Sequence, residues 1–183
     1  IRLVPVTLSA AEIEAYYEGF SKGTLWPLLH DAVVDPEFHR TWWNTYVTVN
    51  RRFATAAARA AAPGATVWVH DYQLMLVPSL LRALRPDLRI GFFLHIPFPP
   101  PEIFAQLPWR KQVVEGMLGA DLVGTQRTSD AANILRSVRR HTDLTTRGQI
   151  VTVGSRWTRP ERHVRIAAFP ISIDSGSISA LAQ

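Results

Sequence analysis

Residues Val67 to Glu102 read VWVHDYQLMLVPSLLRALRPDLRIGFFLHIPFPPPE, and this stretch decides the fold. Two short apolar runs, 67–69 and 90–94, flank a segment whose leucines and valines recur at helical spacing. Strand, helix and strand in that order form a βαβ unit, and such units build parallel sheets. Neither run alternates with polar residues, as expected for strands covered on both faces. We therefore predict an α/β fold: an open, mostly parallel, Rossmann-like sheet with helices on both faces.

Polar side chains stand where the two predicted strands end. His70 and Asp71 follow the first strand, and His95 follows the second. In open parallel sheets, ligands bind beyond the carboxyl ends of the strands. Asp71 and His95 are therefore expected on one edge of the sheet, facing a common cleft. Two structural roles compete with this interpretation: Asp71 could cap a helix that starts at Tyr72, and a lone histidine at a strand end is often structural.

The other elements are predicted from caps, breakers and periodicity. Strands are expected at 3–8, 121–124 and 164–173, and helices at 10–22, 36–62, 101–116 and from residue 130 onward. Gly23 is expected to end the first helix, Pro36 to open the second and Pro108 to break the third. The strands at 67–69, 90–94, 121–124 and 164–169 should be neighbours in the sheet.

Composition limits the class of protein. With 183 residues, of which 47% are hydrophobic, the chain can build one domain with a core. The absence of cysteine excludes disulfides and thiolate zinc sites, and we expect a cytoplasmic location. No apolar run is long enough to cross a bilayer, so no membrane partner is expected. The net charge of +5 reflects arginines between residues 136 and 165, which could attract nucleic acid or phosphorylated ligands but could equally form a solvated surface.

Several chemistries lack their motifs in this sequence. It contains no H-E-x-x-H, P-loop, G-x-S-x-G or G-x-G-x-x-G pattern. It also lacks the D-x-D pair that metal-dependent sugar transferases use. We therefore expect no metal and no dinucleotide cofactor. The charge of a bound diphosphate would have to be neutralised by arginine, lysine or helix N-termini.

The motifs HDYQL and GFFLHIPFPPPEIF resemble those of the trehalose-6-phosphate synthases, a family of two-domain retaining glycosyltransferases. The resemblance runs from about Pro5 to Ile173 and covers the later part of that family's amino-terminal domain. It implies an acceptor-binding Rossmann-like domain over 1–174, incomplete at its start, and a linker over 175–183 towards a second domain.

The resemblance also implies functional residues. The segment YYEGFSKGTLWPLLH is similar to the family's binding segment for the acceptor, glucose 6-phosphate. Tyr17 would bind the phosphate, and Trp26 would shape the sugar pocket. Asp71 would hold the acceptor sugar, and His95 would lie beside the transferred glucose; these two are the expected catalytic residues. Ile96 would help to shape the site of the anomeric carbon.

The implied reaction moves glucose from UDP- or GDP-glucose to glucose 6-phosphate and gives trehalose 6-phosphate with retention of configuration. The implied partners are therefore a sugar phosphate acceptor and a nucleotide-sugar donor, which is a co-substrate rather than a cofactor. Retention by two carboxylates needs a placed nucleophile, and Asp71 is the only plausible carboxylate at the edge. A front-face mechanism, in which the leaving phosphate takes the acceptor proton, is the preferred interpretation.

Parts of the family's active site lie outside this sequence. These are an opening strand, a glycine-containing loop with a phosphate-binding arginine, and the arginine–lysine pair of the second domain. The chain alone is therefore expected to be inactive. Three alternatives stay open: a pseudo-glycosyltransferase that couples cyclitols through nitrogen, as in validoxylamine formation; a non-catalytic regulatory homologue; and a nucleic-acid-binding module, which lacks a recognisable motif. The resemblance leaves a homo-oligomer open.

Overall fold

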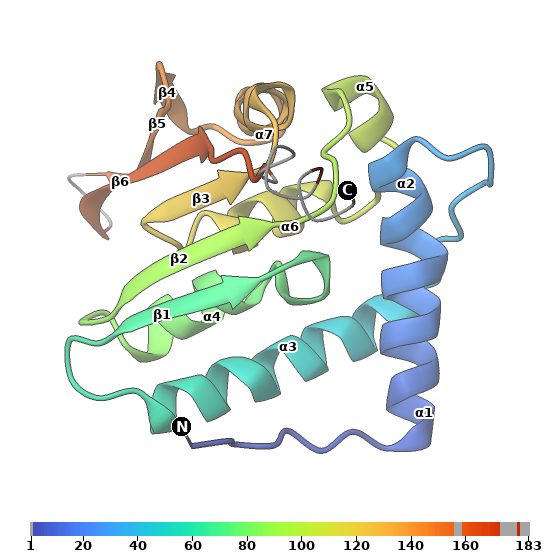
Figure 1. Cartoon of the computed structure of the whole chain (residues 1–183), viewed down its shortest axis with the longest axis horizontal. Coiled ribbons are helices and arrows are strands. Elements are labelled where there is room, and N and C mark those ends of the chain that lie inside the picture. The colour runs from blue at the N-terminus through green and yellow to red at the C-terminus, as the bar shows by residue number, and fades with distance from the viewer. Residues whose placement is uncertain (1, 156–158, 173–178, 180–183) are drawn as a thin grey trace.

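A six-stranded sheet forms the centre of the chain, as a computed structural model shows for residues 2–155, 159–172 and 179 (Figure 1). Its strands are β1 (Thr66–His70), β2 (Arg89–Leu94), β3 (Leu122–Thr125), β4 (Thr145–Arg147), β5 (Ile150–Ser155) and β6 (Arg159–Ala168). The order is β1-β2-β3-β6-β5-β4. The first four strands of that order pair in parallel, and β4 and β5 add antiparallel hairpins at one edge. The predicted open, mostly parallel α/β sheet and its four neighbouring strands are confirmed.

Helices connect the parallel strands and form a wall beside them (Figure 1). They are α1 (Ala10–Glu12), η1 (Ile13–Leu25), α2 (Trp26–His30), α3 (Arg40–Ala60), η2 (Tyr72–Leu74), α4 (Val77–Leu84), α5 (Pro101–Phe104), α6 (Arg110–Met117) and α7 (Thr128–His141). The break expected at Pro108 separates α5 from α6, so that prediction is confirmed. In the part of the chain that the structure describes, no helix combines the length and apolarity needed to span a membrane.

The strand order determines which face of the sheet the helices cover. Each parallel strand is added on the same side of the preceding one, and right-handed crossovers then put every connecting helix on the same face. The side chains of Val69, Phe92, Val123 and Ile166 are accordingly buried in one core with α4, α6 and α7. Helices were expected on both faces of the sheet. In the described residues, the helices between the parallel strands cover only the face that carries Val69 and Phe92. On the opposite face, Trp68 is 66% exposed.

The amino-terminal segment is not a strand. Residues 2–9 are extended, but they pair with no strand among the described residues, so the prediction of a strand over 3–8 is wrong. Leu3 is 87% exposed, and the segment lies along α3, where the Arg52 guanidinium donates to the Thr7 carbonyl (2.8 Å). The apolar run predicted a strand, but a strand needs a neighbour with which to pair.

The first helix passes through Gly23 instead of ending there. The segments α1, η1 and α2 form a continuous helix to His30, and the chain leaves it at Asp31 with a positive φ of 49°. Gly19 and Gly23 face the ring of Trp42 on α3, and a Cβ atom at Gly19 would lie 2.6 Å from that ring. These glycines therefore allow two helices to cross closely, which is why the predicted stop at Gly23 is wrong.

The second helix begins at Arg40 instead of Pro36. The Glu37 backbone N–H donates to the Gly23 carbonyl (3.0 Å), and the Thr24 hydroxyl donates to the Glu37 carbonyl. Residue 37 is thus tied to η1 and cannot enter a helical turn. The linker expected over 175–183 lies outside the described residues, apart from residue 179.

At the amino-terminal end of the sheet, charged side chains form hydrogen bonds with one another and with the backbone. Asp121 accepts hydrogen bonds from the Arg82 guanidinium (2.7 Å) and from the Ile90 backbone N–H (2.8 Å) through the same oxygen. Arg162 donates to the Ala120 carbonyl at 2.7 Å, and burial lowers its pKa from the usual value. Part of the arginine excess in the sequence is therefore used to hold the fold together.

We expect Gly119→Ala to destabilise the fold. A Cβ atom at Gly119 would lie 2.1 Å from the backbone nitrogen of Ser79 on α4, and backbone cannot move aside as a flexible side chain can. Overpacking of this kind costs about 1–3 kcal/mol in the free energy of unfolding, which urea denaturation of the full-length protein would measure. Gly91→Ala is the control, because its Cβ would meet only Trp68 at 3.6 Å. Equal midpoints for the two variants would contradict the prediction.

Candidate functional site

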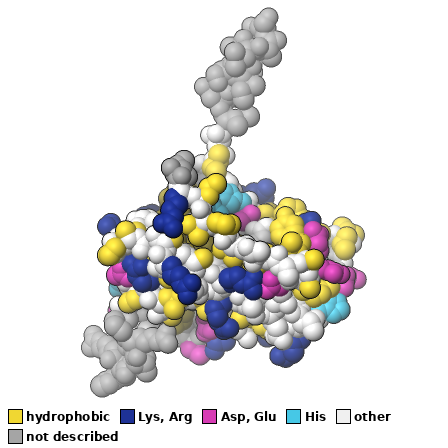
Figure 2. Space-filling model, turned by 90° about the horizontal axis from the view of Figure 1, so that it is seen from below, with side chains coloured by type: hydrophobic (Ala, Val, Ile, Leu, Met, Phe, Trp, Pro, Cys, Tyr) yellow, Lys and Arg dark blue, Asp and Glu magenta, His cyan; other side chains and the backbone are white. Residues whose placement is uncertain are grey.

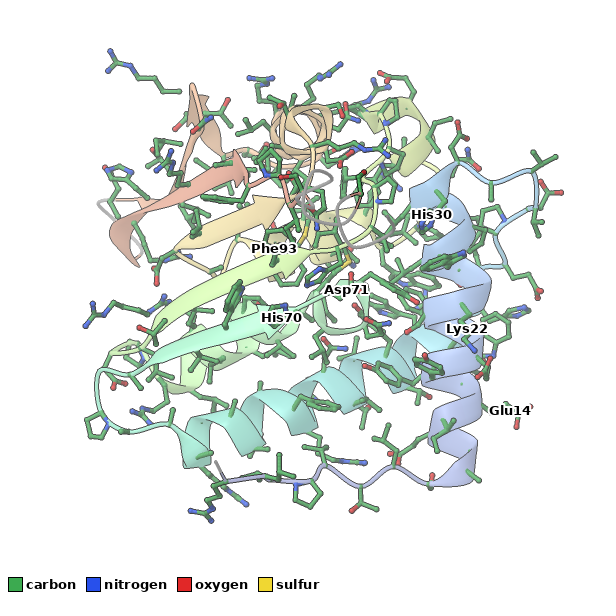
Figure 3. All side chains as sticks on the ribbon, viewed as in Figure 1. Glu14, Lys22, His30, His70, Asp71 and Phe93 are labelled. Atoms are coloured by element: carbon green, nitrogen blue, oxygen red, sulfur yellow. The ribbon has the colours of Figure 1, made fainter. Side chains whose placement is uncertain are left out.

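Hydrogen bonds connect the residues that follow the carboxyl ends of β1 and β2. His70 is opposite Phe93 in the parallel register, and the Asp71 backbone N–H donates to the Phe93 carbonyl (2.8 Å). The carboxylate of Asp71 in turn accepts a hydrogen bond from the His95 backbone N–H (3.2 Å). Figure 3 shows His70, Asp71 and Phe93 together at this end of the sheet. The prediction that Asp71 and His95 share one edge is confirmed.

Asp71 does not act as a helix cap. Its side chain makes no capping hydrogen bond to η2, which starts at Tyr72. Its backbone has φ 72° and ψ 171°, a conformation that costs a residue with a side chain free energy and that is concentrated at functional sites. The carboxylate instead stays at the sheet edge, with one oxygen directed at the backbone of the neighbouring strand.

The turn that follows Asp71 is held by a tyrosine of α3. The Tyr46 hydroxyl donates to the Tyr72 carbonyl (2.7 Å) and accepts from the Met75 backbone N–H (3.1 Å). Tyr46 is fully buried, and this burial raises the pKa of its hydroxyl well above the usual value. One neutral hydroxyl thus serves two backbone groups of the turn that have no water to bind.

A second buried side chain of α3 completes the hold on the turn. The Asn50 amide nitrogen donates to the Gln73 carbonyl (3.0 Å), and its oxygen accepts from the Leu76 backbone N–H (3.2 Å). The Tyr16 hydroxyl, on η1, donates to the same Gln73 carbonyl (3.0 Å). The helix that carries Tyr17 is therefore bonded to the turn that carries Asp71.

Tyr17 and Trp26 meet Asp71 around the ring of Tyr72. The rings of Trp26 and Tyr72 are 5.7 Å apart, and the two expected acceptor-binding side chains are partly exposed, Tyr17 by 39% and Trp26 by 44%. Burial raises the pKa of the Tyr72 hydroxyl, and the nearby Tyr17 and Asp71 raise it further. Residues far apart in the sequence thus lie near one side chain, that of Tyr72.

Ile96, unlike Tyr17 and Trp26, has a buried side chain. Its side chain is only 9% exposed and belongs to the hydrophobic core. Its side chain therefore packs in the interior instead of lining the open edge.

The structure adds residues that the sequence interpretation missed. The Lys22 ammonium lies 4.7 Å from the centre of the Tyr17 ring and pairs with Glu18 at 2.9 Å, which raises the lysine pKa. Lys22 stands five residues after Tyr17, and in the wide turns of η1, where Trp26 donates to the Ser21 carbonyl, that spacing brings side chains together. An α-helical pattern would not have paired them.

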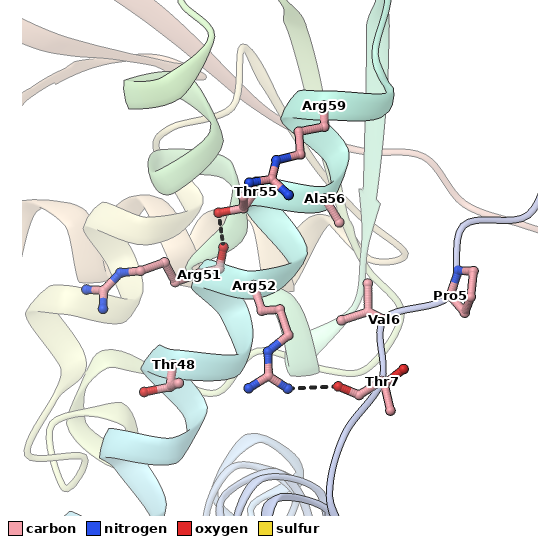
Figure 4. Close-up of a pocket in the computed structure, with 9 residues that line it drawn as sticks. All are labelled: Pro5, Val6, Thr7, Thr48, Arg51, Arg52, Thr55, Ala56 and Arg59. Atoms are coloured by element: carbon pink, nitrogen blue, oxygen red, sulfur yellow. Dashed lines mark hydrogen bonds between the residues drawn. The ribbon is translucent and has the colours of Figure 1, made fainter.

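Two hollows open on the described surface. One, of about 580 Å³, lies on the open face of the sheet and is lined by His70 and His95 with aromatic side chains around them. The other, of about 460 Å³, lies between the amino-terminal segment and α3 (Figure 4). Figure 2 shows lysine and arginine side chains spread over that face, and in Figure 4 Arg51 points away from the segment while Arg52 points towards Thr7. The basic side chains diverge, so the second hollow is not a convergent site.

Among the described residues, no group of three or more histidine, cysteine, aspartate or glutamate side chains is arranged to hold a metal ion. What the edge of the sheet offers a ligand is hydrogen bonding, an indole wall and the ammonium of Lys22.

Fold and site together define a class: a Rossmann-like protein that gathers polar side chains at the carboxyl edge of a parallel sheet, as ligand-binding domains of this type do. The model of glycosyltransferase family 20 matches residues 1–183. The chain therefore belongs to glycosyltransferase family 20.

Individual relatives agree with this assignment. A trehalose-6-phosphate synthase from Mycobacterium sp. (strain KMS) is 58% identical over an alignment that covers 100% of this chain and 38% of that protein. A solved structure from E. coli, bound with UDP-2-fluoro glucose, has a TM-score of 0.84 at 34% identity over 96% of this chain and 38% of its own. A UDP-forming alpha,alpha-trehalose-phosphate synthase from Burkholderia xenovorans, in complex with glucose-6-phosphate, has a TM-score of 0.82 at 31% identity, with 96% and 38% covered. The chain thus spans little more than a third of the length of these relatives.

We expect Tyr46→Phe to destabilise the turn that carries Asp71. The substitution leaves the buried Met75 N–H and Tyr72 carbonyl without their partner. A buried group left unpaired costs about 1–3 kcal/mol, which should appear in the free energy of unfolding measured in urea. Thr45→Val, which removes an exposed hydroxyl bond on the same helix, is the control. If both variants unfolded at the same urea concentration, the turn would not depend on Tyr46.

Proposed function

We propose that this chain is the acceptor-binding part of a longer glycosyltransferase. The enzyme transfers glucose from a nucleotide sugar, UDP- or GDP-glucose, to glucose 6-phosphate and forms trehalose 6-phosphate with retention of configuration. The observation that carries the proposal is the hydrogen bond between Asp71 and His95 at the sheet edge, with Trp26 of α2 packed against the neighbouring Tyr72. Membership of glycosyltransferase family 20 and the named relatives support it.

Each residue has a distinct role in this proposal. The Tyr17 hydroxyl donates to the phosphate of the acceptor. The Trp26 indole forms an apolar wall for the sugar ring. Asp71 would repel the phosphate, so its carboxylate takes the hydroxyl end of the acceptor. His95 and the backbone of Ile96 border the transferred glucose.

The chemistry follows from the scarcity of carboxylates at the edge. A double-displacement mechanism needs a carboxylate nucleophile next to the anomeric carbon, and Asp71 is assigned to the acceptor. The acceptor hydroxyl therefore attacks on the face from which the nucleotide leaves, and the departing phosphate takes its proton. Polar groups stabilise the oxocarbenium-like state, which is electrostatic catalysis. The chain's own part is to bind and orient the acceptor.

Further features of the proposal come from the family resemblance. The domain comprises residues 1–174, followed by a linker, and the enzyme works in the cytoplasm without a metal or other cofactor. The donor diphosphate is held by an arginine–lysine pair in another part of the protein. Nucleic acid is not a partner: Arg162 and Arg140, for example, are engaged by backbone carbonyls and by Glu102.

The alternative with the same fold is a pseudo-glycosyltransferase that joins cyclitols through nitrogen. An assay of the full-length protein with UDP- or GDP-glucose and glucose 6-phosphate separates the two, because only the synthase forms trehalose 6-phosphate. A regulatory homologue would form no product with either pair of substrates. Chromatographic detection of trehalose 6-phosphate supports the proposal, and its absence with both donors overturns it.

We expect Asp71→Ala and Tyr17→Phe to affect different kinetic constants of the full-length enzyme. Loss of the carboxylate that positions the attacking hydroxyl should lower kcat sharply. Loss of the phenolic hydroxyl should raise KM for glucose 6-phosphate, equivalent to about 1–3 kcal/mol of binding free energy.

Steady-state kinetics with varied acceptor would measure both effects. Glu14→Gln is the control on the same helix, because its side chain points away from the sheet in Figure 3. Near-normal turnover of Asp71→Ala, or an unchanged acceptor KM in Tyr17→Phe, would show that these roles are wrongly assigned.

A further inference from the structure

We propose that His70 is a positioning residue that fixes the ring orientation and tautomer of His95, so that His95 presents Nδ1 to the transferred sugar as a hydrogen-bond acceptor. The inference rests on the proposed function for its sugar ligand. His70 follows the first predicted strand, but no functional role was predicted for it. Its significance comes from a contact between two neighbouring strands.

The two imidazoles meet edge to edge. His70 Nδ1 lies 2.9 Å from His95 Nε2, and the ring planes are tilted by 21° with centroids 5.2 Å apart. This distance is that of a hydrogen bond between ring nitrogens. No described residue bonds to Nδ1 of His95, so this nitrogen is left for a ligand.

An aromatic side chain packs against each ring of the pair. The Trp68 ring lies 4.6 Å from the His70 ring, and the Phe93 ring lies 4.7 Å from the His95 ring. The backbone of His95 is separately held by the Asp71 carboxylate. His70 and Asp71 are successive residues, and both contact His95. Asp71 holds the backbone of His95, and His70 holds its ring.

The shared hydrogen bond allows two arrangements of protons. With the proton on His70 Nδ1, both neutral rings are Nδ1–H tautomers; with the proton on His95 Nε2, both are Nε2–H tautomers. A free neutral imidazole side chain carries its proton mainly on Nε2, and a hydrogen bond to one ring nitrogen sets the state of the other. His95 is therefore the donor within the pair, and its Nδ1 carries a lone pair.

The His70 ring is suited to the neutral state that this arrangement needs. Burial lowers the pKa of His70, and the neighbouring His95 lowers it further, while Asp71 opposes the shift. A proton added to Nδ1 of His70 would turn this nitrogen into a donor and remove the acceptor for His95 Nε2–H. A lone pair at Nδ1 of His95 accepts a hydrogen bond from a sugar hydroxyl, which an Nδ1–H group could not do.

The test compares two substitutions of His70 in the full-length enzyme. His70→Asn places an amide oxygen near the position of Nδ1 and keeps an acceptor for His95 Nε2–H, whereas His70→Phe keeps a flat ring and removes the acceptor. We expect His70→Phe to lower kcat about tenfold or more, since small misplacements of active-site groups have effects of this size. The acceptor KM should stay nearly constant, and His70→Asn should restore most of the turnover.

A second readout does not depend on the reaction. Nitrogen-15 NMR of the histidine rings, with the signals of His95 identified by their loss in His95→Gln, should show the Nε2–H tautomer in the wild type and in His70→Asn, and a tautomer mixture in His70→Phe. Thr66→Val, on the same face at the other end of β1, should change neither readout.

The outcomes separate this inference from the proposed function. Wild-type turnover of His70→Phe in an active enzyme, or an Nδ1–H tautomer of His95 in the wild type, would overturn the inference alone. Absence of transferase activity in the wild type would overturn the proposed function, and the NMR result would still decide whether His70 controls the ring of His95.

Discussion

The geometry of the site depends on one link between two strands. The Asp71 N–H bonds to the Phe93 carbonyl and so extends the β1–β2 ladder by one residue, and the Asp71 carboxylate returns to the N–H of His95. Because both bonds follow from the parallel register, a slip of one residue would reverse the side chains of β1 and separate them. The contact between His70 and His95 depends on the same register.

A buried network of hydrogen bonds connects the turn after Asp71 to the helices α3 and η1. The carbonyls and N–H groups of the turn after Asp71 are bonded by Tyr46, Asn50 and Tyr16, which lie in the hydrophobic interior. Such groups cannot exchange a lost partner for water, so breaking one bond leaves an uncompensated donor or acceptor. The turn and η1, the helix that carries Tyr17, therefore hold one relative position.

Much of the fold and part of the candidate site could be predicted from local patterns. Apolar runs without alternation identified the parallel strands, and polar residues at their ends identified Asp71 and His95. The predictions for residues 3–8 and for Gly23 failed because a strand depends on a pairing partner and a glycine on what packs against it. Lys22 and His70 were missed because their contacts depend on π-helical spacing and on strand register.

By itself, the sequence determined the βαβ order, the sheet class and the family motifs, because hydrophobic periodicity and chain order act locally and need no knowledge of distant partners. Only the tertiary structure decided which side chains meet. Tyr17, Trp26 and Asp71 come together through Tyr72, and His70 reaches His95, because helix crossing and strand register set distances between segments far apart in the chain. Those distances are set by packing and by the need to satisfy every buried polar group.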